Sequence, residues 1–112
     1  MSVYVDRPIW RYGRMTMCHM IADMPAELHA MADRIGVARR WFQAPPKASF
    51  WHYDIAKSKR ELAVAAGAIS VERNAFVAAM RRIRESEVFG PNPMKKAAPE
   101  TSPDDEGFGW SP

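Results

Sequence analysis

The chain has 112 residues, of which 47% are hydrophobic and 26% are charged, values typical of one globular domain. No apolar run approaches the ~20 residues of a bilayer-spanning helix, and the N-terminus lacks the apolar stretch of a secretory signal. The one cysteine, Cys18, excludes an internal disulfide and suits a reducing compartment, so we expect a cytoplasmic protein without a membrane partner.

Charge is unevenly distributed along the chain. Residues 1–96 contain all 16 lysines and arginines but only nine of the 13 acidic residues, which gives this part a net charge of +7. Residues 97–112 contain the other four acidic residues. A basic body attracts phosphate-bearing partners, although solubility alone also explains such a charge.

The first 22 residues predict one short strand and one segment of undecided type. VYVD (residues 3–6) alternates β-branched and aromatic side chains ahead of Pro8, as a strand does. RPIWRYGR (residues 7–14) predicts a loop. MTMCHMIA (residues 15–22) fits either a strand or a helix, because a short apolar run does not fix the period.

The rest of the body alternates between helical and β-type patterns. Pro25 opens a helix with an apolar stripe at helical spacing, and Gly36 is placed to end it in the left-handed conformation. The pattern then predicts a second strand at 37–42, a β-leaning segment at 50–55, a helix at 57–66, a third strand at 68–71 and a third helix at 73–86.

This order of elements predicts an α/β domain over residues 1–88, with a small three-stranded, mostly parallel sheet and about three helices. Residues 89–112 are rich in Pro, Gly, Ser and acids, and we expect them to form a disordered tail. Ligands of parallel sheets gather at the carboxyl ends of the strands. We therefore expect Asp6 and the loop around His52 to face each other at one edge.

The segment WHYDIAKSKR is the main candidate for a ligand site. A helix start offers N–H groups to anions, and the lysines, the serine and the arginine add donors. The candidate ligand-binding residues are His52, Tyr53, Asp54, Lys57, Ser58, Lys59 and Arg60. The alternative is that Asp54 simply caps the helix while the basic side chains are solvated.

Four residues of metal-ligating type form a second candidate: Asp6, His19, His52 and Asp54. Imidazole and carboxylate groups suit a divalent cation, but their spacing matches no known metal motif. Asp6 can equally pair with the arginines that follow it. The candidate catalytic residues of a metal-assisted hydrolase are His52, Asp54 and Asp6.

Aromatic and basic residues are interleaved in two regions, and their aromatic members are Trp10, Trp41, Phe42, Phe50, Trp51 and Tyr53. Such a mixture can bind nucleic acid, but a core or a homo-oligomer interface uses aromatic residues as readily. Residues 60–80 also show the Ala63 and Gly67 offset of a helix-turn-helix. Ser70 and Arg73 fall where that motif needs apolar residues, so it remains a minor alternative.

Taken together, VYVD, W…GR (Trp10, Gly13 and Arg14), Cys18-His19, ELHAMADRIG, RRWF, HYD, SKR and AGA resemble the small bacterial and phage proteins grouped as Domain of Unknown Function 4031. The resemblance covers residues 3 to about 71 and implies one compact domain, but it implies no activity, cofactor or functional residue. From the residues themselves we expect binding of a nucleotide or nucleic acid through its phosphate. The alternatives are a metal-assisted hydrolase and a non-catalytic interaction or assembly module.

Overall fold

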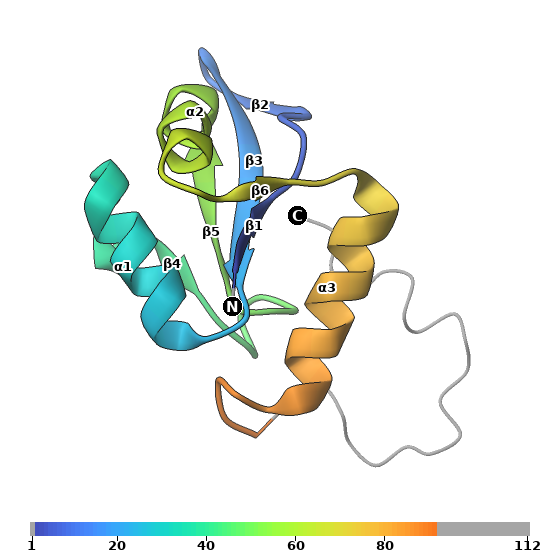
Figure 1. Ribbon diagram of the computed structural model, residues 1–112. Coiled ribbons are helices and arrows are strands. Elements are labelled where there is room, and N and C mark those ends of the chain that lie inside the picture. The colour runs from blue at the N-terminus through green and yellow to red at the C-terminus, as the bar shows by residue number, and fades with distance from the viewer. Residues whose placement is uncertain (1, 92–112) are drawn as a thin grey trace.

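The computed structural model describes residues 2–91, which form a mixed β-sheet with helices on both faces (Figure 1). The strands are β1 (Val3–Val5), β2 (Trp10–Tyr12), β3 (Met15–Ala22), β4 (Phe42–Gln43), β5 (His52–Ala56) and β6 (Ile69–Ser70). The α-helices are α1 (Pro25–Ile35), α2 (Lys57–Ala65) and α3 (Arg73–Ser86), and one 3-10 turn spans Arg39–Trp41.

The sheet has six strands in the order β4-β5-β3-β1-β6, and β2 pairs with the first half of β3. Among the described residues, β1 and β6 pair in parallel and the other four strand pairs are antiparallel. The predicted α/β class is therefore confirmed. The prediction of a three-stranded, mostly parallel sheet is wrong, because it left out the central strand.

That central strand is β3, the segment whose type the sequence left undecided. Tyr12 pairs with Met15, so that Gly13 and Arg14 form a two-residue turn. Gly13 has φ +63°, which a tight hairpin needs at its first central position and which glycine adopts without steric cost. The hairpin also places β2 inside the segment that was predicted to be a loop.

The strand predicted at 37–42 is also wrong. Arg39–Trp41 forms a 3-10 turn with exposed side chains, and only Phe42 belongs to a strand. A strand needs alternating buried and exposed positions to hold one face on the core. Arg39, Arg40 and Trp41 supply three exposed positions in a row, so this segment runs along the surface.

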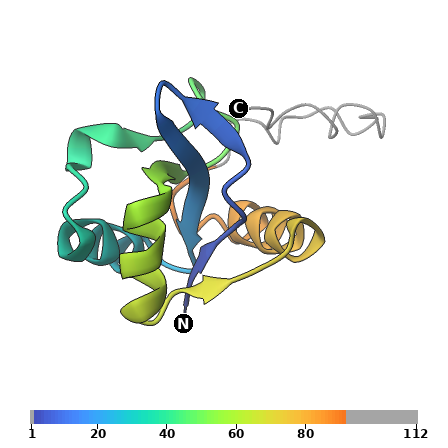
Figure 2. The same ribbon diagram turned by 90° about the horizontal axis from the view of Figure 1, so that it is seen from above.

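The three predicted helices are confirmed, with ends within one residue of the expected ones. Gly36 ends α1 with φ +83°, as its place in the sequence indicated. Helices α1 and α2 lie on one face of the sheet and α3 lies on the other (Figures 1 and 2). Because the sheet separates α2 from α3, these two helices do not form a helix-turn-helix.

Each face of the sheet has its own hydrophobic core. The core beneath α1 and α2 includes Val5, Cys18, Met20, Leu28, Tyr53 and Ile55. The core beneath α3 includes Ile21, Phe50, Phe76, Met80 and Ile83. Since side chains alternate along a strand, Cys18 and Met20 point to the first core and His19 and Ile21 to the second. The face under α3 therefore receives buried polar side chains.

The described chain ends shortly after α3. Phe89, at the start of the predicted tail, packs against both cores, and its ring stacks on Trp51 with centroids 5.5 Å apart. The rest of that tail, residues 92–112, lies outside the described residues. Within residues 2–91, no helix combines the length and the apolar character required to cross a membrane.

Candidate metal centre

Three neighbouring strands place polar side chains in a row on the face under α3. Val5 pairs with Met20, so Asp6 at the end of β1 lies opposite His19 in β3. On the other side of β3, His19 pairs with Asp54 in β5. His52 precedes Asp54 by two residues and therefore faces the same way. The register of the sheet thus gathers four residues that lie far apart in the sequence.

Asp6 holds His19 through two hydrogen bonds. The backbone N–H of His19 donates to Oδ1 of Asp6 at 2.6 Å, and Nδ1 of the ring lies 2.7 Å from Oδ2. Because a carboxylate only accepts, Nδ1 carries the ring proton. In the neutral ring, Nε2 then presents a lone pair to the interior of the site.

A backbone carbonyl orients His52 in the same manner. Nδ1 of His52 lies 2.9 Å from the carbonyl oxygen of Phe50, which also only accepts. The Phe50 ring stacks on the imidazole with centroids 4.2 Å apart. Nδ1 of His52 is therefore the protonated nitrogen, and Nε2 of the neutral ring is left with a lone pair.

Asp54 has one oxygen anchored and one facing the two imidazoles. The side-chain N–H of Gln43 donates to Oδ2 at 2.6 Å. Oδ1 lies 3.2 Å from Nε2 of His52 and 4.0 Å from Nε2 of His19. The 3.2 Å contact lacks the direction of a hydrogen bond and the 4.0 Å contact is too long for one, so Oδ1 is buried without a hydrogen-bond donor among the described residues.

These three atoms converge on one point. Nε2 of His19, Nε2 of His52 and Oδ1 of Asp54 all lie within 4.8 Å of one another. A tetrahedral ion with ligand distances of about 2.0–2.2 Å holds its donor atoms roughly 3.3–3.6 Å apart. Shifts of about 1 Å would therefore bring them to coordinating distance. Two imidazoles and one carboxylate suit zinc and other divalent transition metals.

The site is enclosed but has an open side at Asp54. The side chains of His19 and His52 are 4% and 7% exposed, whereas that of Asp54 is 29% exposed. Trp10 from β2 and Phe76 from α3 close the far side, with ring centroids 4.6 Å and 5.7 Å from that of His19. Solvent therefore reaches the site past Asp54.

Two pKa values reflect this environment. Burial raises the pKa of the Asp54 carboxyl, but the imidazole of His52 in its protonated form, the hydrogen bond from Gln43 and the protonated form of His19 together lower it further, so that the net pKa lies below its ordinary value. Asp54 is therefore ionised at neutral pH. Burial, reinforced by the charge of Asp6, raises the pKa of the Cys18 thiol to about 12. The thiol of Cys18 is therefore held in its neutral form at neutral pH.

The structure divides the predicted ligand-binding segment between two faces of the sheet. His52 and Asp54 lie under α3, whereas the hydroxyl of Tyr53 lies 2.8 Å from Nδ1 of His29 on the other face. Asp54 does not cap α2, because Ala56 occupies that position and no side chain caps the helix.

The basic residues of the segment point in different directions. Nζ of Lys59 lies close to Gly36 at the end of α1. Arg60 donates from Nε to the backbone oxygen of Asp6 at 2.8 Å and from a terminal N–H to the Ser70 hydroxyl at 2.5 Å. Lys57 and Ser58 are exposed. Only these last two therefore remain directed at solvent beside the start of α2.

Sequence reasoning missed the groups that orient the three converging side chains. Gln43 lies between the strand predicted at 37–42 and the β-leaning segment at 50–55, in a stretch to which no role was given, and the carbonyl of Phe50 carries no side-chain signal. The aromatic residues also separate: Phe50, Trp51 and Tyr53 are buried within the chain, whereas Trp41 is 57% exposed. They do not form a single surface patch.

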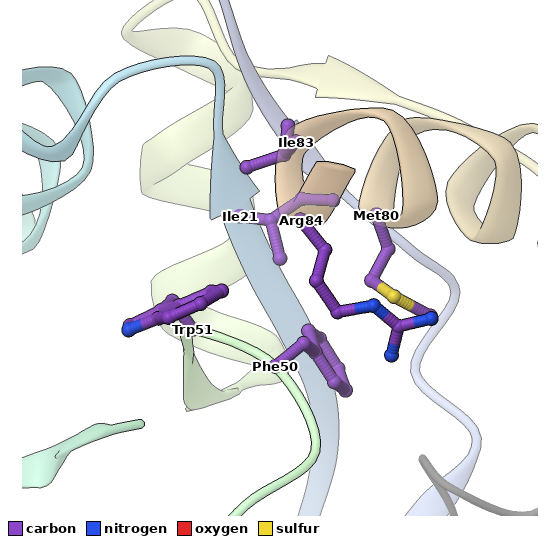
Figure 3. A pocket seen from close by; sticks show the side chains of 6 residues that line it. All are labelled: Ile21, Phe50, Trp51, Met80, Ile83 and Arg84. Carbon is purple, nitrogen blue, oxygen red and sulfur yellow. The ribbon is translucent and has the colours of Figure 1, made fainter. Parts of the chain in front are cut away.

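A narrow crevice adjoins the site behind Phe50. It is lined by Ile21, Phe50, Trp51, Met80, Ile83 and Arg84, between α3 and the segment leading into β5 (Figure 3). The crevice has no room for a water molecule. It therefore belongs to the core and is not a substrate pocket.

The chain belongs to the family described as protein of unknown function DUF4031, whose model matches residues 3–83. The match includes all four polar residues of the site and most of α3, so it extends beyond the segment that carried the resemblance. No curated protein and no solved structure matches the chain.

Proposed function

We propose that this member of the DUF4031 family binds a divalent transition-metal ion through Nε2 of His19, Nε2 of His52 and Oδ1 of Asp54, and uses it for metal-assisted hydrolysis. One observation carries the proposal. Each of the three side chains has its other polar atom fixed by Asp6, by the Phe50 carbonyl or by Gln43. The three remaining donor atoms face one another.

This arrangement is costly without a positive charge between the donors. Two imidazole lone pairs and a carboxylate oxygen meet in an enclosed space, and Oδ1 of Asp54 has no hydrogen-bond donor among residues 2–91. Leaving a buried acceptor unsatisfied costs about 1–3 kcal/mol, and more for a charged group. A bound cation removes this cost and uses all three lone pairs.

The surrounding groups match the second shell of metal sites in proteins. Histidine ligands commonly donate their other ring N–H to a carboxylate or to a backbone carbonyl, which fixes the tautomer and increases the basicity of the ligand nitrogen. His19 and His52 supply one example of each. Asp6 is therefore a positioning residue for His19.

Three protein ligands leave a coordination position open for water, as in catalytic zinc sites. A divalent ion in such a site lowers the pKa of bound water and polarises an ester oxygen. The net reaction would add one water across the scissile bond. Its oxygen would bind the acyl or phosphoryl centre, and the leaving oxygen would depart with the bonding electron pair and take up a proton.

A second candidate function is the binding of a phosphate-bearing ligand at the start of α2. Lys57 and Ser58 are exposed there, and no side chain caps the first-turn N–H groups. These groups would bind phosphate at a helix N-terminus. Because Lys59 and Arg60 point elsewhere, this site has fewer donors than the sequence suggested, and we place it second.

Metal binding is tested by calorimetry and thermal unfolding of the metal-stripped full chain with zinc, manganese, cobalt, ferrous iron and magnesium. We expect one equivalent of a transition metal to bind and to raise the unfolding temperature. The variants His52→Gln and Asp54→Asn should lose this response. His29→Gln is the matched control, because His29 lies on the other face beside Tyr53 and should leave metal binding unchanged.

Hydrolysis is tested on bis(4-nitrophenyl) phosphate and 4-nitrophenyl acetate with the metal-loaded chain. Activity should disappear on chelation, return on adding the metal and be absent from Asp54→Asn. Metal binding of normal strength in His52→Gln would refute the ligand set. Binding without activity on either ester would refute the hydrolase while leaving the metal site in place.

A further inference from the structure

Helix α3 covers only part of its face of the sheet. In Figure 1 the hairpin of β2 and β3 extends above the start of α3. On this face, the hydrophobic core under α3 ends near His19, whose ring contacts that of Phe76. No described helix lies over β2 and the first half of β3 on the same face. The uncovered part of this face begins beside the proposed metal ligands.

This uncovered face carries large side chains that are exposed. Trp10 pairs with Met17 and Tyr12 pairs with Met15, and the contact between Trp10 and His19 shows which side they face. Tyr12 is 69% exposed and Met15 is 44% exposed. A structural role in the core explains Trp10, but it does not explain two large exposed side chains next to it.

Unpaired positive charge lies at the border of this face. Arg14 occupies the hairpin turn, and Lys57 follows Ala56, which pairs with Met17. Both side chains are exposed, and neither has an ion pair or hydrogen bond with another described residue. Aromatic rings beside unpaired cations are the arrangement that proteins use to stack bases and hold phosphates.

We infer that this face, defined by Trp10, Tyr12, Met15, Arg14 and Lys57, binds a single strand of nucleic acid and leads it to the metal site. The inference rests on the proposed function, because it names the substrate class of the hydrolase. The bases would stack on Tyr12 and on the outer edge of Trp10. The backbone would lie near Arg14 and Lys57, which places one phosphodiester at Asp54.

The dimensions fit a short stretch of strand. From Met15 to His19 the chain advances four residues, or about 13 Å at ~3.3 Å per residue. Tyr12 and Trp10 are two residues apart and so lie roughly 7 Å from each other along β2. That length accommodates a few nucleotides between the hairpin turn and the metal ligands. A duplex has its bases stacked inside and would not offer them to the two rings.

The test is fluorescence anisotropy of the full chain with a fluorescein-labelled 12-mer of thymidylate, at low salt and with zinc. We expect Tyr12→Ala to weaken binding about 5- to 150-fold, the range measured for the loss of one stacked base. Trp41→Ala is the matched control, since Trp41 is an exposed ring at the β4 edge of the sheet beside Arg40, and should bind as the parent does. Arg14→Gln with Lys57→Gln should reduce the slope of log K against log salt by about 1.4.

The outcomes separate this inference from the proposed function. Binding that is equally strong for a 12-mer duplex, or unchanged in Tyr12→Ala, would overturn the stacking surface. Zinc binding without detectable strand binding would overturn the inference and leave the metal site intact. Strand binding that depends on Tyr12, in a chain that binds no metal, would support the surface and refute the hydrolase. Circular dichroism of each variant confirms that it is folded.

Discussion

Replacing Asp6 by Asn changes one atom, the carboxylate oxygen Oδ2 that faces Nδ1 of His19, and leaves the three proposed metal ligands in place. The Asn oxygen can still accept the backbone N–H of His19, but its NH₂ group would then face Nδ1 of the ring, where Oδ2 now accepts. Two donors cannot pair, so the neutral ring would move its proton to Nε2. That transfer removes the lone pair with which His19 would bind the ion.

The expected loss can be calculated from the role of Asp6. Removing a second-shell partner lowers metal affinity about 10- to 100-fold. A metal at 100 times its dissociation constant stabilises the folded chain by ~2.7 kcal/mol, and a 100-fold weaker site reduces this to ~0.4 kcal/mol. For a domain of this size, 1 kcal/mol corresponds to about 4–8 °C. A 10-fold weaker site leaves ~1.4 kcal/mol, so the metal-induced rise should fall from roughly 10–20 °C to about 2–11 °C.

Thermal unfolding with and without zinc measures this difference, and calorimetry gives the affinity directly. Asp23→Asn is the matched control, because Asp23 is a mostly buried carboxylate that follows β3 and binds Arg82 at 3.0 Å, away from the proposed metal ligands. That variant should be less stable but should keep the full zinc-induced rise. A wild-type rise in Asp6→Asn would show that the tautomer of His19 does not control metal binding.

Two further predictions concern the fold. Burial raises the pKa of Asp23, but Arg82, the Ser2 N–H and Tyr4 lower it further, so the folded value lies below the unfolded value of about 3.9. The stability that the ionised Asp23 contributes is complete above its unfolded pKa and is lost as the pH falls through its folded pKa. The urea midpoint should therefore decline less steeply from pH 6 to pH 3 in Asp23→Asn than in the parent chain. Phe89→Ala removes a ring stacked on Trp51 and should cost about 2 kcal/mol, less than the ~3–5 kcal/mol of a fully buried phenylalanine, because Phe89 is only half-buried. A urea midpoint unchanged by that substitution would mean that Phe89 adds nothing to the core.

The members of the candidate centre were identifiable as residue types but not as a site. Asp6, His19, His52 and Asp54 were recognised as metal-ligating residues without a motif spacing. Their proximity depends on cross-strand register, in which residues far apart in sequence lie opposite each other on one face. No local pattern encodes that register.

The predicted anion site failed to assemble for a similar reason. Consecutive residues in a strand point to opposite faces. The side chain of Tyr53 therefore had to lie on the face opposite to those of His52 and Asp54 once β5 formed. The sequence left open whether residues 50–55 formed a full strand, and treated HYD as a unit. Gln43 was missed because its role depends on the pairing of β4 with β5.

Local sequence determined the helices and the end of α1. Apolar spacing and the positions of Pro25 and Gly36 act over a few residues and need no partner. Tertiary structure alone decided the direction of the strands, the identity of the central strand and the meeting of His19, His52 and Asp54. The physical reason is that a strand satisfies its backbone hydrogen bonds only with another strand, so its place and register are properties of the pair.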